Sequence, residues 1–129
     1  MKQSVNQLDA LLEGAYLIGE TTPRLSDQVL AYGELLSSEI MAAYLQSLGI
    51  DLTYWDARLL IHTNSQHGKA QVDTATTYSA LQQAAASGHQ VQIMGGFIGS
   101  DALGHTTTLG RGGSDYSASL AAAGLSARE

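Results

Sequence analysis

Apolar residues recur with helical spacing in four segments of the chain and alternate with polar residues in two others. The pattern predicts helices over Gln3–Ile18, Gln28–Leu48, Thr76–Ala86 and Tyr116–Leu125, and strands over Ile50–Trp55 and His89–Met94. Asp56 is expected to open a short helix or turn that ends at Leu60. Alternating helices and strands favour a layered α/β fold in which most strands are parallel.

Residues with strong local preferences mark the predicted boundaries. Pro23 cannot continue a helix, so the first helical segment is expected to break before it. Ser26 or Asp27 is expected to cap the second helix, and Gly49 to end it. Ser114 or Asp115 is the expected cap of the last helix. Between the elements, residues 61–69 are predicted to be loop and residues 71–75 a short strand or extended entry.

Composition limits the function classes. The chain has 129 residues, the size of one domain, with 44% apolar and only 14% charged residues. A net charge of −6 without a basic run argues against nucleic-acid binding. The absence of cysteine excludes disulfides and thiolate sites, and the four histidines lack metal-ligand spacing, so no metal site is predicted. With no apolar stretch long enough for a membrane span and no signal core, a cytoplasmic location without membrane partners is expected.

The most informative segment runs from Thr106 to Ala118, where hydroxyls, three glycines, Arg111 and Asp115 precede a helical tail. Glycines allow a ligand to approach the backbone closely, and N–H groups at a helix N-terminus attract anions. A guanidinium suits a carboxylate, and an aspartate can hold an amine. The segment therefore favours an anion-binding loop before a helix. A surface turn with an aspartate cap is the alternative.

Read as a motif, Thr106 to Asp115 resembles the TTTLGRGGSD signature of the aspartate kinases in the amino-acid kinase superfamily. Three other segments resemble that family in order and spacing: Gly33–Ser38 its GE helix start, Asp56–Thr63 its D-x-R segment and Gly95–Gly99 its GFIG turn. The resemblance covers the chain from about Leu11 to its end. It implies a layered α/β/α amino-acid kinase fold with a mostly parallel central sheet, present here as a partial domain over residues 1–129.

The resemblance also implies a reaction. Aspartate kinases transfer the γ-phosphoryl group of ATP, bound with Mg²⁺, to the β-carboxylate of L-aspartate, which gives 4-phospho-L-aspartate for lysine, threonine and methionine biosynthesis. L-Aspartate and ATP are the expected partners, and a full-length parent is expected to be a homo-oligomer. Another kinase of a small acid, of the glutamate 5-kinase or acetylglutamate kinase type, is an alternative, but those kinases have a different sequence in this loop. A non-catalytic ligand-binding domain is the rival of a different class.

Site residues are carried over from the family motifs position by position. Glu34 matches the glutamate that contacts the substrate amino group, and Arg111 the arginine that pairs with its α-carboxylate. Phe97, Gly112, Gly113 and Ser114 match residues that line the substrate site, and Asp115 matches a catalytic aspartate that fixes a lysine. Without the resemblance, Glu34 and Arg111 would be interpreted as solvated charges, Phe97 as a core residue and Asp115 as a helix cap.

Two family segments have no counterpart in the sequence. The KFGGTS loop, whose lysine stabilises the transferring phosphoryl group, does not precede Glu34, and the TD-[VM]-x-G nucleotide motif does not follow the last helix. The expectation is an internal piece of a catalytic domain that carries the aspartate half of the site and shows no turnover alone.

Overall fold

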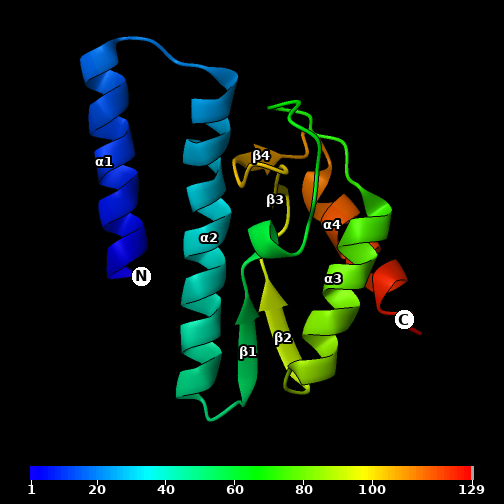
Figure 1. Ribbon diagram of the computed structural model, residues 1–129. Coiled ribbons are helices and arrows are strands. Elements are labelled where there is room, and N and C mark those ends of the chain that lie inside the picture. The colour runs from blue at the N-terminus through cyan, green and yellow to red at the C-terminus, as the bar shows by residue number, and fades with distance from the viewer. Residues whose placement is uncertain (129) are drawn as a thin grey trace.

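The computed structural model describes residues 1–128, in which four α-helices, a 3-10 helix and four strands occur (Figure 1). In chain order these are α1 (Lys2–Ile18), α2 (Pro23–Ser47), β1 (Leu52–Trp55), η1 (Ala57–Leu59), α3 (Thr74–Ser87), β2 (Val91–Met94), β3 (Ile98–Ser100), β4 (Thr106–Thr108) and α4 (Gly113–Gly124). All helices and strands predicted from the spacing of apolar residues are present. The short helix after Asp56 is also present, and the Asp56 carboxylate caps it by accepting a hydrogen bond from the Arg58 N–H.

A parallel pair of strands lies between helical layers. Leu52 of β1 is opposite Val91 of β2, and Trp55 is opposite Met94. The chain passes from β1 to β2 through α3, as a parallel connection requires. In Figure 1, α2 lies along one side of this pair, and α3 and α4 lie on the other side. The predicted layered α/β class is therefore confirmed.

A second, antiparallel pair was not predicted. Ile98 of β3 is opposite Thr108 of β4, and Ser100 is opposite Thr106. All six residues of this hairpin are buried, although four of them are hydroxyl residues. The hydroxyls of Ser100, Thr107 and Thr108 find partners inside the protein: Thr107 Oγ1 lies 2.7 Å from Thr63 Oγ1, for example. Strands of three residues rich in glycine and threonine carry no apolar alternation, so their pattern is that of a loop.

The expected caps of two helices are wrong. α2 begins at Pro23, and the Thr22 hydroxyl accepts a hydrogen bond from the Leu25 N–H at 3.1 Å. Proline fits the first helical position because its missing N–H would have no partner there. α4 begins at Gly113 after Gly112, without a side-chain cap. Asp27 and Asp115 therefore lie inside helices, Asp27 near the start of α2 and Asp115 in the first turn of α4.

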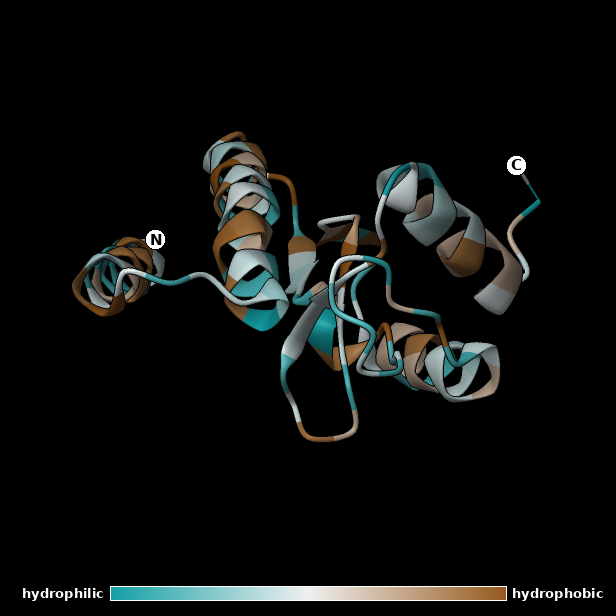
Figure 2. Cartoon of the chain, turned by 90° about the horizontal axis from the view of Figure 1, so that it is seen from above, coloured by the Kyte–Doolittle hydropathy of each residue, from teal (hydrophilic) through white to brown (hydrophobic). Residues whose placement is uncertain are grey.

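The core lies between α2, η1 and β3. Its buried members are Ala31, Tyr32, Leu35, Ala57, Ile61 and Ile98, with Met94, Phe97 and Leu109 packed against it. α1 contributes no buried residue and lies at the edge of the molecule along α2 (Figure 2). No helix among residues 1–128 is long and apolar enough to cross a membrane.

Candidate functional site

The site forms at the end of β2, where two glycines let the chain pass between α2 and α4. A Cβ on Gly95 would lie 3.2 Å from the backbone oxygen of Glu34 in α2. A Cβ on Gly96 would lie 3.0 Å from the Cα of Ser114 in α4. Side chains at these positions would push the helices away from the turn. The paired glycines thus bring Glu34 and Ser114 to the same strand end.

Phe97 follows the glycines in a left-handed conformation, with φ +70°, which is uncommon outside glycine. Hydrogen bonds hold it on both sides. Its N–H donates to Ser117 Oγ at 3.0 Å, and its carbonyl accepts from the Leu109 N–H at 2.9 Å. Its ring covers Gly113, where a Cβ would lie 2.9 Å from Phe97 Cδ2. Phe97 therefore supports the start of α4.

The segment that carries Arg111 joins β4 to the N-terminus of α4. Gly110 and Gly112 both have left-handed backbones, with φ +76° and +74°. A Cβ on Gly110 would lie 3.2 Å from the Gly68 oxygen, so residues 68–69 support this segment from behind. The expectation that the glycine-rich loop lies before a helix is confirmed, because α4 begins at Gly113. Such an N-terminus favours negative charge.

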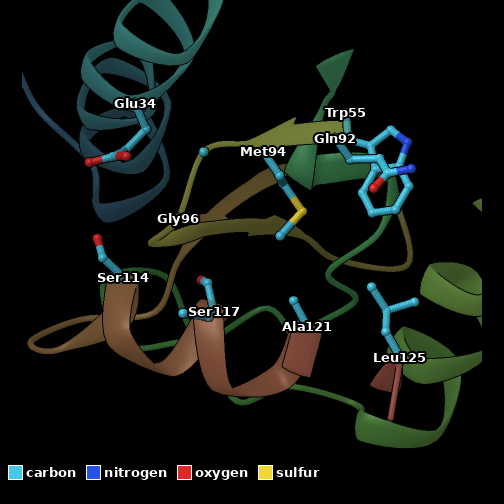
Figure 3. Close-up of a pocket in the computed structure, with 11 residues that line it drawn as sticks. Glu34, Trp55, Gln92, Met94, Gly96, Ser114, Ser117, Ala121 and Leu125 are labelled. Carbon is cyan, nitrogen blue, oxygen red and sulfur yellow. The ribbon is translucent and has the colours of Figure 1, made fainter. Parts of the chain in front are cut away.

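A pocket of about 340 Å³ opens between the end of β2 and α4 (Figure 3). This volume lies within the range of about 300–1,000 Å³ typical of small-molecule sites. In Figure 3, Glu34 and Ser114 lie on facing walls at one end, and Trp55 and Leu125 lie at the other. The remaining lining residues are Gln92, Met94, Gly95, Gly96, Ser117, Ala118 and Ala121. One end is therefore polar and the other is mostly apolar.

The pocket brings together only some of the predicted site residues. Glu34 and Ser114 line it, whereas Arg111 and Asp115 are exposed and do not line it, and Gly112 precedes α4. Within residues 1–128, neither Glu34 nor Arg111 forms a salt bridge. Both charges are thus available to a ligand. That Glu34 and Arg111 grip one ligand stays a prediction.

Tyr54 takes part in a network of hydroxyl groups behind the turn. Its hydroxyl is 3.3 Å from Ser38 Oγ, and the Ser38 hydroxyl donates to the Glu34 carbonyl at 2.6 Å. Burial raises the pKa of Tyr54 above its usual value of 10.0, so its hydroxyl stays protonated at neutral pH. The hydroxyl network anchors the backbone of the Glu34 turn.

Two functional candidates were missed in the sequence. Ser117 is three residues after Ser114, a helical spacing that places both on the pocket face of α4. Asp27 precedes Glu34 by seven residues, close to two helical turns, and is buried. Helical spacing could have identified both, because residues at such intervals share one face of a helix. The local pattern of Asp27, a carboxylate shortly after a proline, is instead that of a helix cap.

Histidine and acidic residues form pairs in the structure, as Asp27 with His67, Asp51 with His89 and Asp101 with His105. In the part of the chain that the structure describes, no group of three or more His, Cys, Asp or Glu residues could hold a metal ion.

Comparison with known proteins identifies relatives. Residues 3–129 match the amino acid kinase family. Lysine-sensitive aspartokinase 3 of Escherichia coli (strain K12) is 37% identical over 128 residues, which cover 94% of this chain and 28% of that protein. The chloroplastic bifunctional aspartokinase/homoserine dehydrogenase 1 of Arabidopsis thaliana is 32% identical over 125 residues, covering 95% of this chain and 14% of that protein.

Solved structures agree with the sequence relatives. The crystal structure of E. coli aspartokinase III in complex with aspartate and ADP matches with a TM-score of 0.88 at 35% identity, over 98% of this chain and 28% of that one. The structure of Clostridium acetobutylicum aspartate kinase matches with a TM-score of 0.71 at 26% identity, over 96% and 25%. The chain spans less than a third of the length of these relatives.

Proposed function

This chain belongs to the amino acid kinase family, and from that premise we propose that it supplies the L-aspartate site of an aspartate kinase. The reaction is transfer of the γ-phosphoryl group of ATP to the β-carboxylate of L-aspartate, which gives 4-phospho-L-aspartate. The observation that carries the proposal is the pocket at the end of β2, where Glu34 of α2 faces the N-terminus of α4. Its support is the aspartokinase identity of the relatives.

The two ends of an aspartate molecule need opposite charges. Glu34 is half-buried and free of salt bridges in the described residues, so its carboxylate can take the substrate ammonium. Arg111 offers two parallel N–H donors to a carboxylate, a geometry that lysine lacks. Phe97 sets the turn that faces the substrate, and the N–H groups of residues 112–114 add positive potential where α4 begins. Ser114 adds a hydroxyl at the pocket wall.

Phosphoryl transfer depends mainly on positioning and on charges around the transferred group. We assign Asp115, exposed in the first turn of α4, to orienting a cationic group toward that charge. No group of three or more His, Cys, Asp or Glu residues among the described residues could hold a metal ion, and Mg²⁺ enters the proposal only as the ion bound with ATP, with no step assigned to it. ATP enters the proposal as the phosphoryl donor, and lysine, threonine and methionine biosynthesis as the pathway served.

The proposal is tested by calorimetric titration of the chain with L-aspartate, L-glutamate and N-acetyl-L-glutamate, beside a coupled assay of ADP release. We expect saturable binding of L-aspartate and at least tenfold weaker binding of the longer acids. Arg111→Ala should weaken L-aspartate binding by about tenfold or more, because the carboxylate loses a charged, bidentate partner. Arg24→Ala, which removes an exposed arginine in the first turn of α2, is the control and should change nothing.

The outcomes separate the candidate functions. Preference for N-acetyl-L-glutamate or L-glutamate would replace aspartate kinase by the related acid kinases. Binding of L-aspartate without ADP release is the expected result, because the proposal assigns only the L-aspartate site to this chain. Equal effects of Arg111→Ala and Arg24→Ala would contradict the assignment of Arg111.

A further inference from the structure

Asp27 is a carboxylate buried inside α2, with only 1% of its surface exposed. Three donors converge on it. The Thr108 hydroxyl donates to Oδ1 at 2.6 Å, the Gly68 N–H lies 3.0 Å from Oδ1 and 3.1 Å from Oδ2, and His67 Nδ1 lies 2.8 Å from Oδ2. A buried carboxylate is costly unless donors surround it. Asp27 is therefore a fixed junction whose position depends on these partners.

The donors come from the two segments that support the Arg111 loop. Thr108 ends β4, three residues before Arg111. Gly68 lies against Gly110, and the Ala70 N–H donates to the Thr108 carbonyl at 2.9 Å. Residues 67–70 and β4 thus form one bonded unit under residues 109–111. Asp27 joins this unit to α2.

α2 also carries Glu34. Asp27 and Glu34 are seven residues apart, so they lie along the same side of the helix, separated by about 10 Å along its axis. α2 therefore carries Glu34, the proposed partner of the ammonium group, and supports the loop of Arg111, the proposed partner of the carboxylate, through Asp27. Any shift of the Asp27 junction would change the separation between Glu34 and Arg111.

We propose that Asp27 is a positioning residue of the L-aspartate site, which sets the Arg111 loop at its distance from Glu34 without contacting the ligand. The inference rests on the function proposed above. Asp27 acts through Thr108 and through residues 67–70. Both depend on its carboxylate, because its two oxygens accept their hydrogen bonds.

Asp101 provides a matched comparison. It is also buried, with 4% exposure, and it accepts hydrogen bonds from the Leu103 N–H, the His105 N–H and the Ser65 hydroxyl. A histidine Nδ1 lies beside it as well, that of His105 at 3.3 Å. Asp101, however, holds the tip of the β3–β4 hairpin and not the Arg111 loop. A general loss of stability would appear in variants of both aspartates, whereas a positioning effect would appear only at Asp27.

The test compares Asp27→Asn and Thr108→Val with Asp101→Asn, using the whole chain. L-Aspartate affinity is measured by calorimetry, and the amide resonances of Gly110, Gly112 and Gly113 are followed by NMR. We expect Asp27→Asn and Thr108→Val to weaken binding about tenfold and to move these resonances. Thr108→Ser, which keeps the hydroxyl, should restore affinity to within about threefold of the original chain. The affinity of Asp101→Asn should stay within about twofold of that of the original chain.

Unchanged affinity and unchanged glycine resonances in a folded Asp27→Asn chain would overturn the inference, as would equal losses in Asp101→Asn. If Asp27→Asn fails to fold, the contrast between Thr108→Val and Thr108→Ser decides. If the unaltered chain does not bind L-aspartate, the proposed function fails, and the glycine resonances still show whether Asp27 positions the loop.

Discussion

The backbone N–H of Phe97 donates a hydrogen bond to Ser117 Oγ at 3.0 Å, which ties the turn after β2 to α4. The same hydroxyl donates to the Gly113 carbonyl at 2.9 Å. Ser117 is 1% exposed, so both of its bonds lie inside the protein. One hydroxyl therefore satisfies the N–H of a residue whose left-handed backbone is itself unfavourable. Without it, the pocket wall loses the link between its two sides.

We expect Ser117→Ala to lower the free energy of unfolding by about 1–3 kcal/mol, because the buried Phe97 N–H loses its acceptor. Ser119→Ala is the control, since Ser119 lies on the exposed side of α4 and its hydroxyl bonds only to the Asp115 carbonyl, also at 2.9 Å. Its effect should stay within about 0.5 kcal/mol. Urea denaturation of both variants measures the difference, and equal effects would show that the contact to Phe97 adds no stability.

Elements in which apolar residues repeat at regular spacing could be predicted from the sequence, whereas the hairpin built from polar residues could not. The helices and the parallel strands β1 and β2 were predicted because apolar residues repeat along them. The β3–β4 hairpin was missed because its threonines are buried, and the hydroxyls of Thr107 and Thr108 pair with residues far along the chain. Such pairing depends on tertiary contacts, which one sequence does not display.

The candidate site divides in the same way. Motif resemblance identified Glu34 and Ser114, which the structure places at one pocket. It gave no account of Asp27, because a carboxylate just after a proline turn has the local pattern of a helix cap. Its true partners, Thr108 and Gly68, are 81 and 41 residues away.

Gly99 in β3 should tolerate no side chain. A Cβ there would lie 2.5 Å from the Ile61 backbone oxygen and 3.1 Å from Thr63 Cγ2. The Ser100 N–H donates to that same Ile61 oxygen at 3.0 Å, so the backbone cannot withdraw without losing a hydrogen bond. We expect Gly99→Ala to destabilise the fold by about 1–3 kcal/mol or more. Thermal and urea unfolding provide the measurement.

Gly14→Ala is the matched control for Gly99. Gly14 is inside α1, and apart from its chain neighbours and the backbone of its own helix no atom lies within 4 Å of its Cβ position. Alanine favours a helix over glycine by about 1 kcal/mol. This substitution should raise stability slightly. A Gly99→Ala chain as stable as the original would show that residues 61–63 lie farther from β3.

Stability should fall in acid because of Asp101. Burial raises the pKa of this carboxyl, but hydrogen bonds from the His105 N–H, the Ser65 hydroxyl and the Leu103 N–H outweigh it and lower the pKa from 3.8 to about 2. The unfolded chain therefore takes up this proton first as the pH falls. Its contribution is complete above about pH 4 and is lost as the pH falls toward 2.

Free energies of unfolding measured between pH 6 and pH 2 test this assignment. Asp101→Asn should lower stability at neutral pH and flatten the acid decline, because the titrating group is gone. Asp73, whose pKa is lowered chiefly by the Thr76 hydroxyl, titrates in the same direction at an exposed helix cap. Asp73→Asn thus separates the two contributions. An acid decline that is unaltered in Asp101→Asn would assign the loss to other carboxyls.

Glu34→Gln should remove the preference for a ligand with an amino group. The variant keeps the size of the side chain and loses the charge that faces the pocket. L-Aspartate and succinate differ by the ammonium group, so their relative affinities report on its partner. We expect the original chain to bind L-aspartate about tenfold or more tightly than succinate, and Glu34→Gln to bind both within about twofold. Glu13→Gln, on the exposed side of α1, should keep the original preference. The affinities of both ligands for the original chain and for Glu34→Gln are measured by calorimetry. An equal loss of affinity for L-aspartate and succinate would mean that Glu34 shapes the pocket and does not bind the ammonium.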